Sequence, residues 1–291
     1  MNKFVGKVGI GEILVWIFLL LLLAFVIVPI LFMIVASFMD PKQILAMPFT
    51  WIPSSKYFTS GDRTFFTNFY RAIMGNNNNP TFFRNLLNSL IVAITCSITT
   101  VILAALCGYG LAKFRFKGRQ AVFISIMATM MIPFEAIMIP LYMVTQSFGM
   151  INSYAGLIIP FLVSAFGVFQ MRQYLLTFPS EYLDAARVDG LGEFKLFWRI
   201  VFPNCTPVVA TLGILSFRNQ WDNLLWPLLV AQSEKMKTIP LYITKFSEEK
   251  LTDEGAMMAV AFLASIPMFI LFFTLSKYFL GGAAVYESRK G

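Results

Sequence analysis

Five polar or aromatic side chains in the apolar segment 206–230 have the chemistry to contact a transported solute. They are Arg218, Asn219, Asp222, Asn223 and Trp226. An α-helix turns by about 100° per residue, so the five would share one arc about 140° wide. Amides and carboxylates pair with hydroxyl groups, and an indole ring can cover the C–H face of a sugar. The pattern therefore predicts a pathway for a sugar along this arc.

The same side chains also have a structural interpretation. Arg218 and Asp222 lie four residues apart, a spacing at which an ion pair can form along one helix face. The two asparagines could instead bond to neighbouring helices, and Arg218 could face an acidic sugar. An Arg or Asp at the centre of a lipid-exposed span costs roughly 2.5–3.5 kcal/mol. In every interpretation, these polar side chains must therefore face protein or water rather than lipid.

A charged stretch at 179–203, between two apolar segments, predicts two short helices joined by a glycine corner. Ser180 is a residue type that caps helices, and acidic residues follow it near the positive end of the helix dipole. Gly190 and Gly192 interrupt the helical run, and either could adopt the left-handed conformation that stops a helix. A second helical run follows and ends at Pro203. The alternative is an amphipathic connector that lies on the membrane surface.

The spacing within this stretch resembles the signature of ABC-importer permeases. That signature is Glu-Ala-Ala, three residues, Gly, nine residues, Ile, one residue and Leu-Pro. Here it becomes Asp184-Ala185-Ala186, Gly190, Ile200 and Phe202-Pro203, and the two differences keep charge or apolar character. The small alanine side chains would let the first helix enter a groove on another protein. The resemblance implies a coupling helix that docks into a separate cytoplasmic ATPase through Glu181, Tyr182, Asp184, Ala185, Ala186, Asp189 and Gly190.

The resemblance covers most of the chain from Leu86 onward and is nearest to the maltose-type "G" subunit of carbohydrate importers. It is carried by Ala105–Arg119, by Ile132–Leu175 and by the two Trp positions 221 and 226. It implies a bacterial cytoplasmic membrane, a second and dissimilar permease, two copies of the ATPase, and an extracytoplasmic sugar-binding protein.

Composition independently places the chain among polytopic membrane proteins. Of its 291 residues, 58% are hydrophobic and 13% are charged, whereas soluble domains have about 25% charged residues. A helix needs about 20 apolar residues to cross a bilayer. We therefore expect an all-α fold with six transmembrane helices, at about 13–38, 86–112, 121–145, 154–174, 206–230 and 256–280. The coupling loop lies at 179–203, residues 1–12 precede the first span, and the tail is 281–291.

Positive charge predicts the orientation of these spans. Residues 113–119, directly after the second span, include four Lys or Arg and no acid. Short loops of this kind stay in the cytoplasm, and six spans put both termini on that side. The net charge of +8 is spread over such loops rather than gathered in one patch. We therefore expect membrane lipid, and not nucleic acid, around the chain.

The sequence lacks the residue patterns that are typical of enzyme active sites. It contains no His, no paired catalytic acids, no nucleophile motif and no G-x-x-x-x-G-K-[ST] phosphate loop. We expect no catalytic residue, metal or cofactor in this chain, and the resemblance assigns ATP and Mg²⁺ to the partner ATPase. The alternative function is an ion-coupled secondary transporter or channel, whose intramembrane acids would be Glu135 and Asp222. As an acid inside a span, Glu135 could have a functional role, or Pro133 and Pro140 could place it near a surface or a kink.

Overall fold

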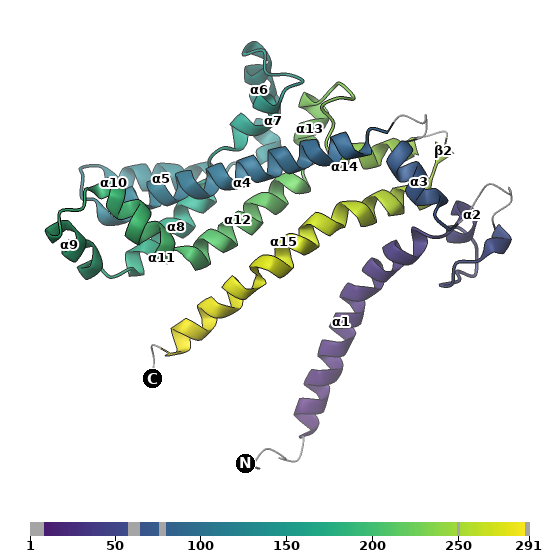
Figure 1. The fold of residues 1–291 in the computed structure, drawn as a ribbon, viewed down its shortest axis with the longest axis horizontal. Helices are drawn as coiled ribbons and strands as arrows, with labels where there is room; N and C mark the ends of the chain where they lie inside the picture. Colours follow the sequence, from purple (N-terminus) through teal and green to yellow (C-terminus); the bar gives the residue numbers. More distant parts are fainter. Residues whose placement is uncertain (1–8, 58–64, 76–79, 249–250, 289–291) are drawn as a thin grey trace. The chain divides into compact units, whose positions relative to one another are not determined.

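The structure is a computed structural model that describes residues 9–57, 65–75, 80–248 and 251–288, with the side chains of 248, 251–252 and 276–288 left out. The prediction of an all-α fold is confirmed (Figure 1). Within these ranges, the strands β1 (Ser247–Glu248) and β2 (Leu251–Thr252) pair antiparallel over two residues each. Residues 1–8 and 289–291, expected to be cytoplasmic, lie outside the described residues.

The chain divides into two compact units, Met1–Pro80 with Ile243–Ala264, and Thr81–Tyr242 with Ser265–Gly291. The first unit contains α1 (Ile10–Ala36), α2 (Pro41–Ile44), α3 (Thr67–Met74) and the beginning of α15 (Glu254–Ser288). Asn68 holds this unit together, because its Nδ2 donates to the carbonyl groups of Ser37 at 3.0 Å and Met39 at 2.6 Å.

The second unit contains the segments with candidate function. Its helices are α4 (Phe82–Lys113), α5 (Arg119–Thr129), α6 (Phe134–Ser147), α7 (Tyr154–Ile158), α8 (Ala165–Thr177), α9 (Glu181–Val188), α10 (Glu193–Leu196), α11 (Phe202–Asn204), α12 (Thr206–Trp221), α13 (Leu225–Val230) and α14 (Ile239–Ile243). A π-helical turn, Phe197–Val201, joins α10 to α11, and a 3₁₀ turn, Ile159–Phe161, follows α7.

The long helix α4 packs along α8 and α12 (Figure 1). Small residues make this close packing possible. A Cβ atom added at Gly108 would lie 2.6 Å from the Cβ of Met171 in α8. On the α12 side, the Ser97 hydroxyl donates to the Gly213 carbonyl at 2.7 Å. Tertiary packing thus holds α4 on two sides.

The first turns of α4 bind the segment that precedes α14. The Nδ2 group of Asn88 donates to the carbonyl groups of Lys235 at 3.0 Å and Lys237 at 2.9 Å. The hydroxyl group of Ser89 accepts from the backbone N–H of Ile239 at 2.8 Å. These bonds fix the loop between α13 and α14 to one end of α4.

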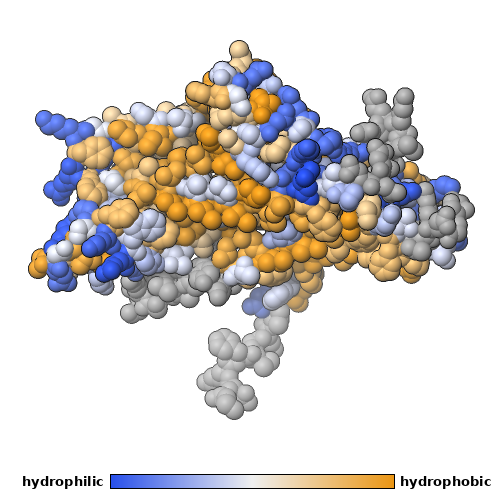
Figure 2. All heavy atoms as spheres, turned by 45° about the horizontal axis from the view of Figure 1, so that its top comes forward, coloured by the Kyte–Doolittle hydropathy of each residue, from blue (hydrophilic) through white to orange (hydrophobic). Residues whose placement is uncertain are grey.

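Among the described residues, three helices are long and apolar enough to cross a membrane: α1, α4 and the Glu254–Leu275 part of α15. Three further pairs qualify together but are bent, by 96° between α5 and α6, by 41° between 154–161 and α8, and by 80° between 193–204 and α12. Six spans result if each bent pair counts as one, so the number six stays a prediction. Broad apolar areas on the face seen in Figure 2 suit a protein surrounded by hydrocarbon.

Three expected spans are not single straight helices. In 154–174, α7 and the 3₁₀ turn end at Phe161, and α8 begins only at Ala165. In 121–145, α5 ends at Thr129 and α6 begins after Pro133, because the residue before a proline disfavours helical backbone. In 206–230, α12 ends at Trp221, and α13 begins only at Leu225.

Candidate functional site

Two parts of the second unit are candidates for a functional site. They are the coupling segment, residues 179–204, and a polar cavity beside α12.

The coupling segment contains the predicted glycine corner, and the left-handed conformation predicted for Gly190 is confirmed. Its φ is +82°, and its N–H donates to the Arg187 carbonyl at 3.0 Å. The next N–H, of Leu191, donates to the Ala186 carbonyl at 3.0 Å. This is the Schellman arrangement of a helix end. Gly192 is extended instead, with φ −68°.

The beginning of the coupling segment differs from expectation. Ser180 makes no side-chain cap, because its backbone is helical (φ −77°, ψ −20°) rather than extended. Its hydroxyl group instead lies 3.3 Å from the ammonium group of Lys113, which also donates to the Phe178 carbonyl at 2.6 Å. The last residue of α4 therefore holds the chain that enters α9.

A network of charged groups closes the corner between α9 and α10. Arg187 donates from Nε to Glu193 Oε1 at 2.7 Å and from Nη1 to Asp184 Oδ1 at 2.8 Å. The hydroxyl group of Tyr109, in α4, donates to Glu193 Oε2 at 2.8 Å. Hydrogen bonds from Arg187, reinforced by that of Tyr109, lower the pKa of Glu193 despite partial burial. Sequence analysis missed Tyr109 and Glu193, since no local pattern links them.

One face of α9 packs inward and the other is exposed. Leu183 and Ala186 are buried in a cluster with Leu196 and Phe197. The expectation that Ala186 offers its side chain to a partner is therefore wrong, because its methyl group fills internal space. The other six residues expected at the ATPase contact are exposed: Glu181, Tyr182, Asp184, Ala185, Asp189 and Gly190.

Large apolar side chains on the exposed face strengthen the case for a protein contact. Tyr182 is 60% exposed, Val188 88% and Phe194 71%. Exposed apolar groups within a charged segment are typical of a docking surface. Val188 and Phe194 could have been found from the sequence as apolar residues placed beside the charged corner.

The polar cavity has a volume of about 640 Å³ and lies against α12. Three of the five residues of the predicted arc line it: Asn219, Asp222 and Asn223. Further lining groups are Thr100, Glu135, Ser164, Ser216, Gln220 and the rings of Phe134, Phe161 and Phe166. Cavities of this size, with hydrogen-bonding groups beside aromatic walls, are typical of small-molecule sites.

The single helical arc itself is wrong. Beyond Trp221 the chain leaves the helix, and the side-chain Oδ1 of Asn223 accepts the N–H of Trp226 at 3.2 Å to begin α13. Pro227 explains the break, since it has no N–H to donate and its ring would clash with the Asn223 carbonyl of a continuous helix.

Trp226 consequently lies away from the polar groups. Its side chain is 1% exposed, and its Nε1 donates to the Gly156 carbonyl at 2.9 Å. Its ring centroid lies 6.1 Å from that of Phe134 and 5.9 Å from that of Phe161. Trp226 therefore supports the aromatic wall of the cavity from behind, which corrects its expected place at the centre of the arc.

The ion pair of the structural interpretation is also present. Arg218 Nε lies 3.4 Å from Asp222 Oδ2, and both side chains are 61% exposed. Arg218 is not among the residues that line the cavity, whereas Asp222 is. Asp222 therefore both lines the cavity and pairs with Arg218, so the two interpretations of Asp222 are compatible.

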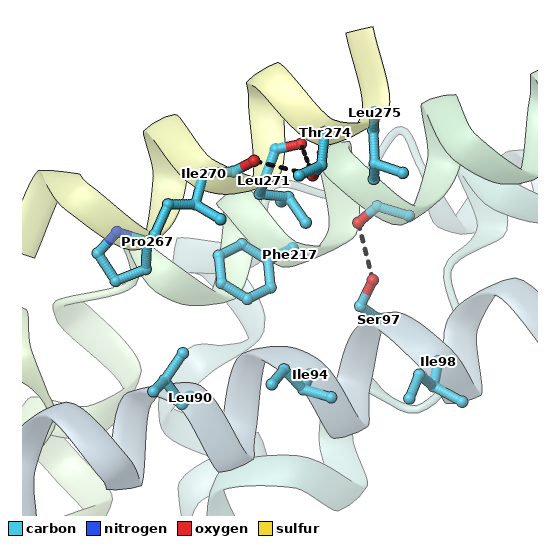
Figure 3. Close-up of a pocket in the computed structure, with 11 residues that line it drawn as sticks. Leu90, Ile94, Ser97, Ile98, Phe217, Pro267, Ile270, Leu271, Thr274 and Leu275 are labelled. Atoms are coloured by element: carbon cyan, nitrogen blue, oxygen red, sulfur yellow. Dashed lines mark hydrogen bonds between the residues drawn. The ribbon is translucent and has the colours of Figure 1, made fainter. Parts of the chain in front are cut away.

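A second hollow, of about 540 Å³, lies between α4, α12 and α15 and is apolar. Figure 3 shows side chains of α4 and α15 facing it from opposite sides. Its hydroxyl groups are already used, since Ser97 donates to Gly213 and Thr274 to Ile270. It has little to offer a sugar, so the polar cavity is the better candidate pathway. In the described part of the chain, no three His, Cys, Asp or Glu residues gather as a metal site requires.

Comparison with known proteins now decides the family. The family model for inner membrane components of binding-protein-dependent transport systems matches residues 100–282. The chain belongs to this family. This inner membrane component is 36% identical over 209 residues to the arabinooligosaccharides transport system permease protein AraQ of Bacillus subtilis (strain 168), covering 72% of this chain and 74% of AraQ.

Another relative is the sn-glycerol-3-phosphate transport system permease protein UgpE of Brucella abortus (strain 2308). It is 32% identical over 273 residues, which cover 92% of this chain and 95% of UgpE. A crystal structure of a bacterial ABC transporter that imports the acidic polysaccharide alginate has a chain with the same fold. Its TM-score is 0.79 at 20% identity, with 96% of this chain and 100% of that chain covered.

Proposed function

We propose that this chain is a permease subunit of an ATP-driven importer for a sugar or oligosaccharide. It forms half of the translocation pathway beside a second, dissimilar permease. Two copies of a cytoplasmic ATPase bind the ATP and Mg²⁺, and an extracytoplasmic binding protein delivers the sugar. Family membership supports the transport role, and the relative that handles arabinooligosaccharides supports the substrate class.

The observation that carries the coupling role is the construction of the coupling segment. Its exposed face presents Tyr182, Val188 and Phe194, while its other face is bonded to α4 through Glu193 and Lys113. A segment that exposes apolar side chains on one face and is hydrogen-bonded to α4 on the other can transmit the movement of a docked partner to a membrane helix. When ATP closes the ATPase pair, the segment moves as one body, and the spans change the side to which the pathway opens.

The polar cavity forms this chain's wall of the pathway in the proposal. Asn219 and Asn223 offer amide donors and acceptors, and Phe161 offers an apolar surface for the C–H face of a sugar. In the proposed orientation, the coupling segment and both termini face the cytoplasm, which the basic residues at 113–119 favour.

Substitution of Val188 by Asp tests the docking role in the assembled importer. An unpaired carboxylate buried in a contact is costly, so we expect lower ATPase co-purification and loss of ATP-driven sugar uptake. The control is Thr177→Asp, which adds the same charge at an exposed site just before the segment. Wild-type ATPase binding by Val188→Asp would contradict the docking role. Uptake that persists without ATP would instead favour an ion-coupled carrier.

A further inference from the structure

The polar cavity carries acidic side chains on its wall. Two carboxylates, of Glu135 and Asp222, line it, and its described lining residues include no Lys or Arg. Asp222 is matched by Arg218 at 3.4 Å. In the described part of the chain, no cation pairs with Glu135. The wall of the cavity is therefore negative, and the negative charge is centred on Glu135.

The break between α5 and α6 explains how Glu135 reaches the cavity. Pro133 caps α6 after a bend of 96°, and Glu135 follows in the first turn. The Glu135 side chain is exposed and belongs to the cavity lining.

The groups around Glu135 match the chemistry of an uncharged sugar. Carboxylate oxygens only accept hydrogen bonds, and sugar hydroxyl groups donate them. The amides of Asn219 and Gln220 both donate and accept, and the rings of Phe134 and Phe161 cover apolar faces. A phosphate or uronate group would instead meet like charge with no arginine fork to bind it.

We infer, on the basis of the proposed function, that this importer carries an uncharged oligosaccharide and that Glu135 determines this specificity. Glu135 accepts hydrogen bonds from the hydroxyl groups of the passing sugar and repels anionic sugars.

The test uses the complete importer in proteoliposomes with its binding protein. Binding and uptake are measured for uncharged oligosaccharides, including arabino-oligosaccharides and lactose, and for anionic probes, alginate oligosaccharides and sn-glycerol 3-phosphate. We expect uptake of an uncharged sugar only. Glu135→Gln should lower that uptake about tenfold, the scale of one charge-assisted hydrogen bond, with Glu135→Asp in between. Glu12→Gln, which removes a carboxylate outside the cavity lining, is the control.

The rate of ATP hydrolysis without sugar shows whether each variant assembles, because a misfolded subunit would lower it. Efficient uptake of an anionic probe would overturn the inference while leaving the importer function intact. So would unchanged uptake of the uncharged sugar by Glu135→Gln. If no sugar of either charge binds or enters, the proposed function fails, and the inference fails with it.

Discussion

The hydroxyl group of Tyr109 donates a 2.8 Å hydrogen bond to the carboxylate of Glu193. Tyr109 lies near the end of α4, and Glu193 opens α10 beyond the glycine corner. The same carboxylate accepts two bonds from Arg187, at 2.7 Å and 3.4 Å. The Glu193 side chain thus connects α9 and α10, the two short helices of the coupling segment, to α4.

Removing the Tyr109 hydroxyl should weaken coupling without disturbing packing. Tyr109→Phe keeps the ring contacts with Phe114 and Phe197 but loses a bond worth roughly 1 kcal/mol. We expect fewer sugar molecules transported per ATP hydrolysed. The measurement is that ratio in proteoliposomes, with the exposed Tyr70→Phe as control. An unchanged ratio would show that the bond is not part of coupling.

The corner at Gly190 should resist substitution far more than its neighbour does. With φ at +82°, an alanine at Gly190 costs about 1–2 kcal/mol, although no atom lies within 4 Å of an added Cβ. Gly192 also has open space but an ordinary φ of −68°, so Gly192→Ala should be nearly neutral. Limited proteolysis of the segment measures the difference. Equal sensitivity of the two variants would contradict the left-handed corner.

Acid should loosen the coupling segment through Glu193. Its pKa is lowered from the ordinary value of 4.5 by hydrogen bonds from Arg187 and Tyr109. A lowered carboxylate pKa contributes stability that is full above the ordinary value and is lost as the pH falls through the lowered value. We expect proteolytic protection of 179–204 to be constant from neutral pH down to about 5 and to fall below 4.5. Glu193→Gln should remove this pH dependence; if it persists in that variant, another group is responsible.

The crossing of α4 and α8 should not tolerate a methyl group at Gly108. An added Cβ would lie 2.6 Å from Met171 Cβ and 2.9 Å from the backbone nitrogen of Arg172. Overpacking of this kind costs about 1–3 kcal/mol, so Gly108→Ala should lower the thermal stability of the purified protein. Gly110→Ala meets no atom within 4 Å and should be neutral or stabilising. A stable Gly108→Ala protein would mean that the helices move apart easily.

Local chemistry explains what could be predicted from the sequence. The Gly190 corner depends on residues within one turn, so its composition was sufficient to predict it. The apolar helices follow from composition in the same way. The position of Asn219 and Asp222 on a cavity wall was also predicted, because neither group can face lipid without cost.

The failures involve contacts between distant residues or competing local signals. Tyr109 and Glu193 are 84 positions apart, and nothing in either neighbourhood predicts their bond. The burial of Ala186 depends on how α9 packs onto other elements. The predicted arc is wrong for a local reason, since Pro227 breaks the helix that the regular spacing of polar residues predicts.

Helix α4 is held at both of its ends. Near its beginning, Asn88 binds the loop before α14, and near its end Tyr109 binds the coupling segment. At 1.5 Å per residue, positions 88 and 109 are about 32 Å apart along one unbroken helix, close to the roughly 30 Å depth of a bilayer interior. Helix α4 is therefore continuous and has no hinge between these two positions. A tilt of the helix at one end must displace the loop bound at the other end at the same time.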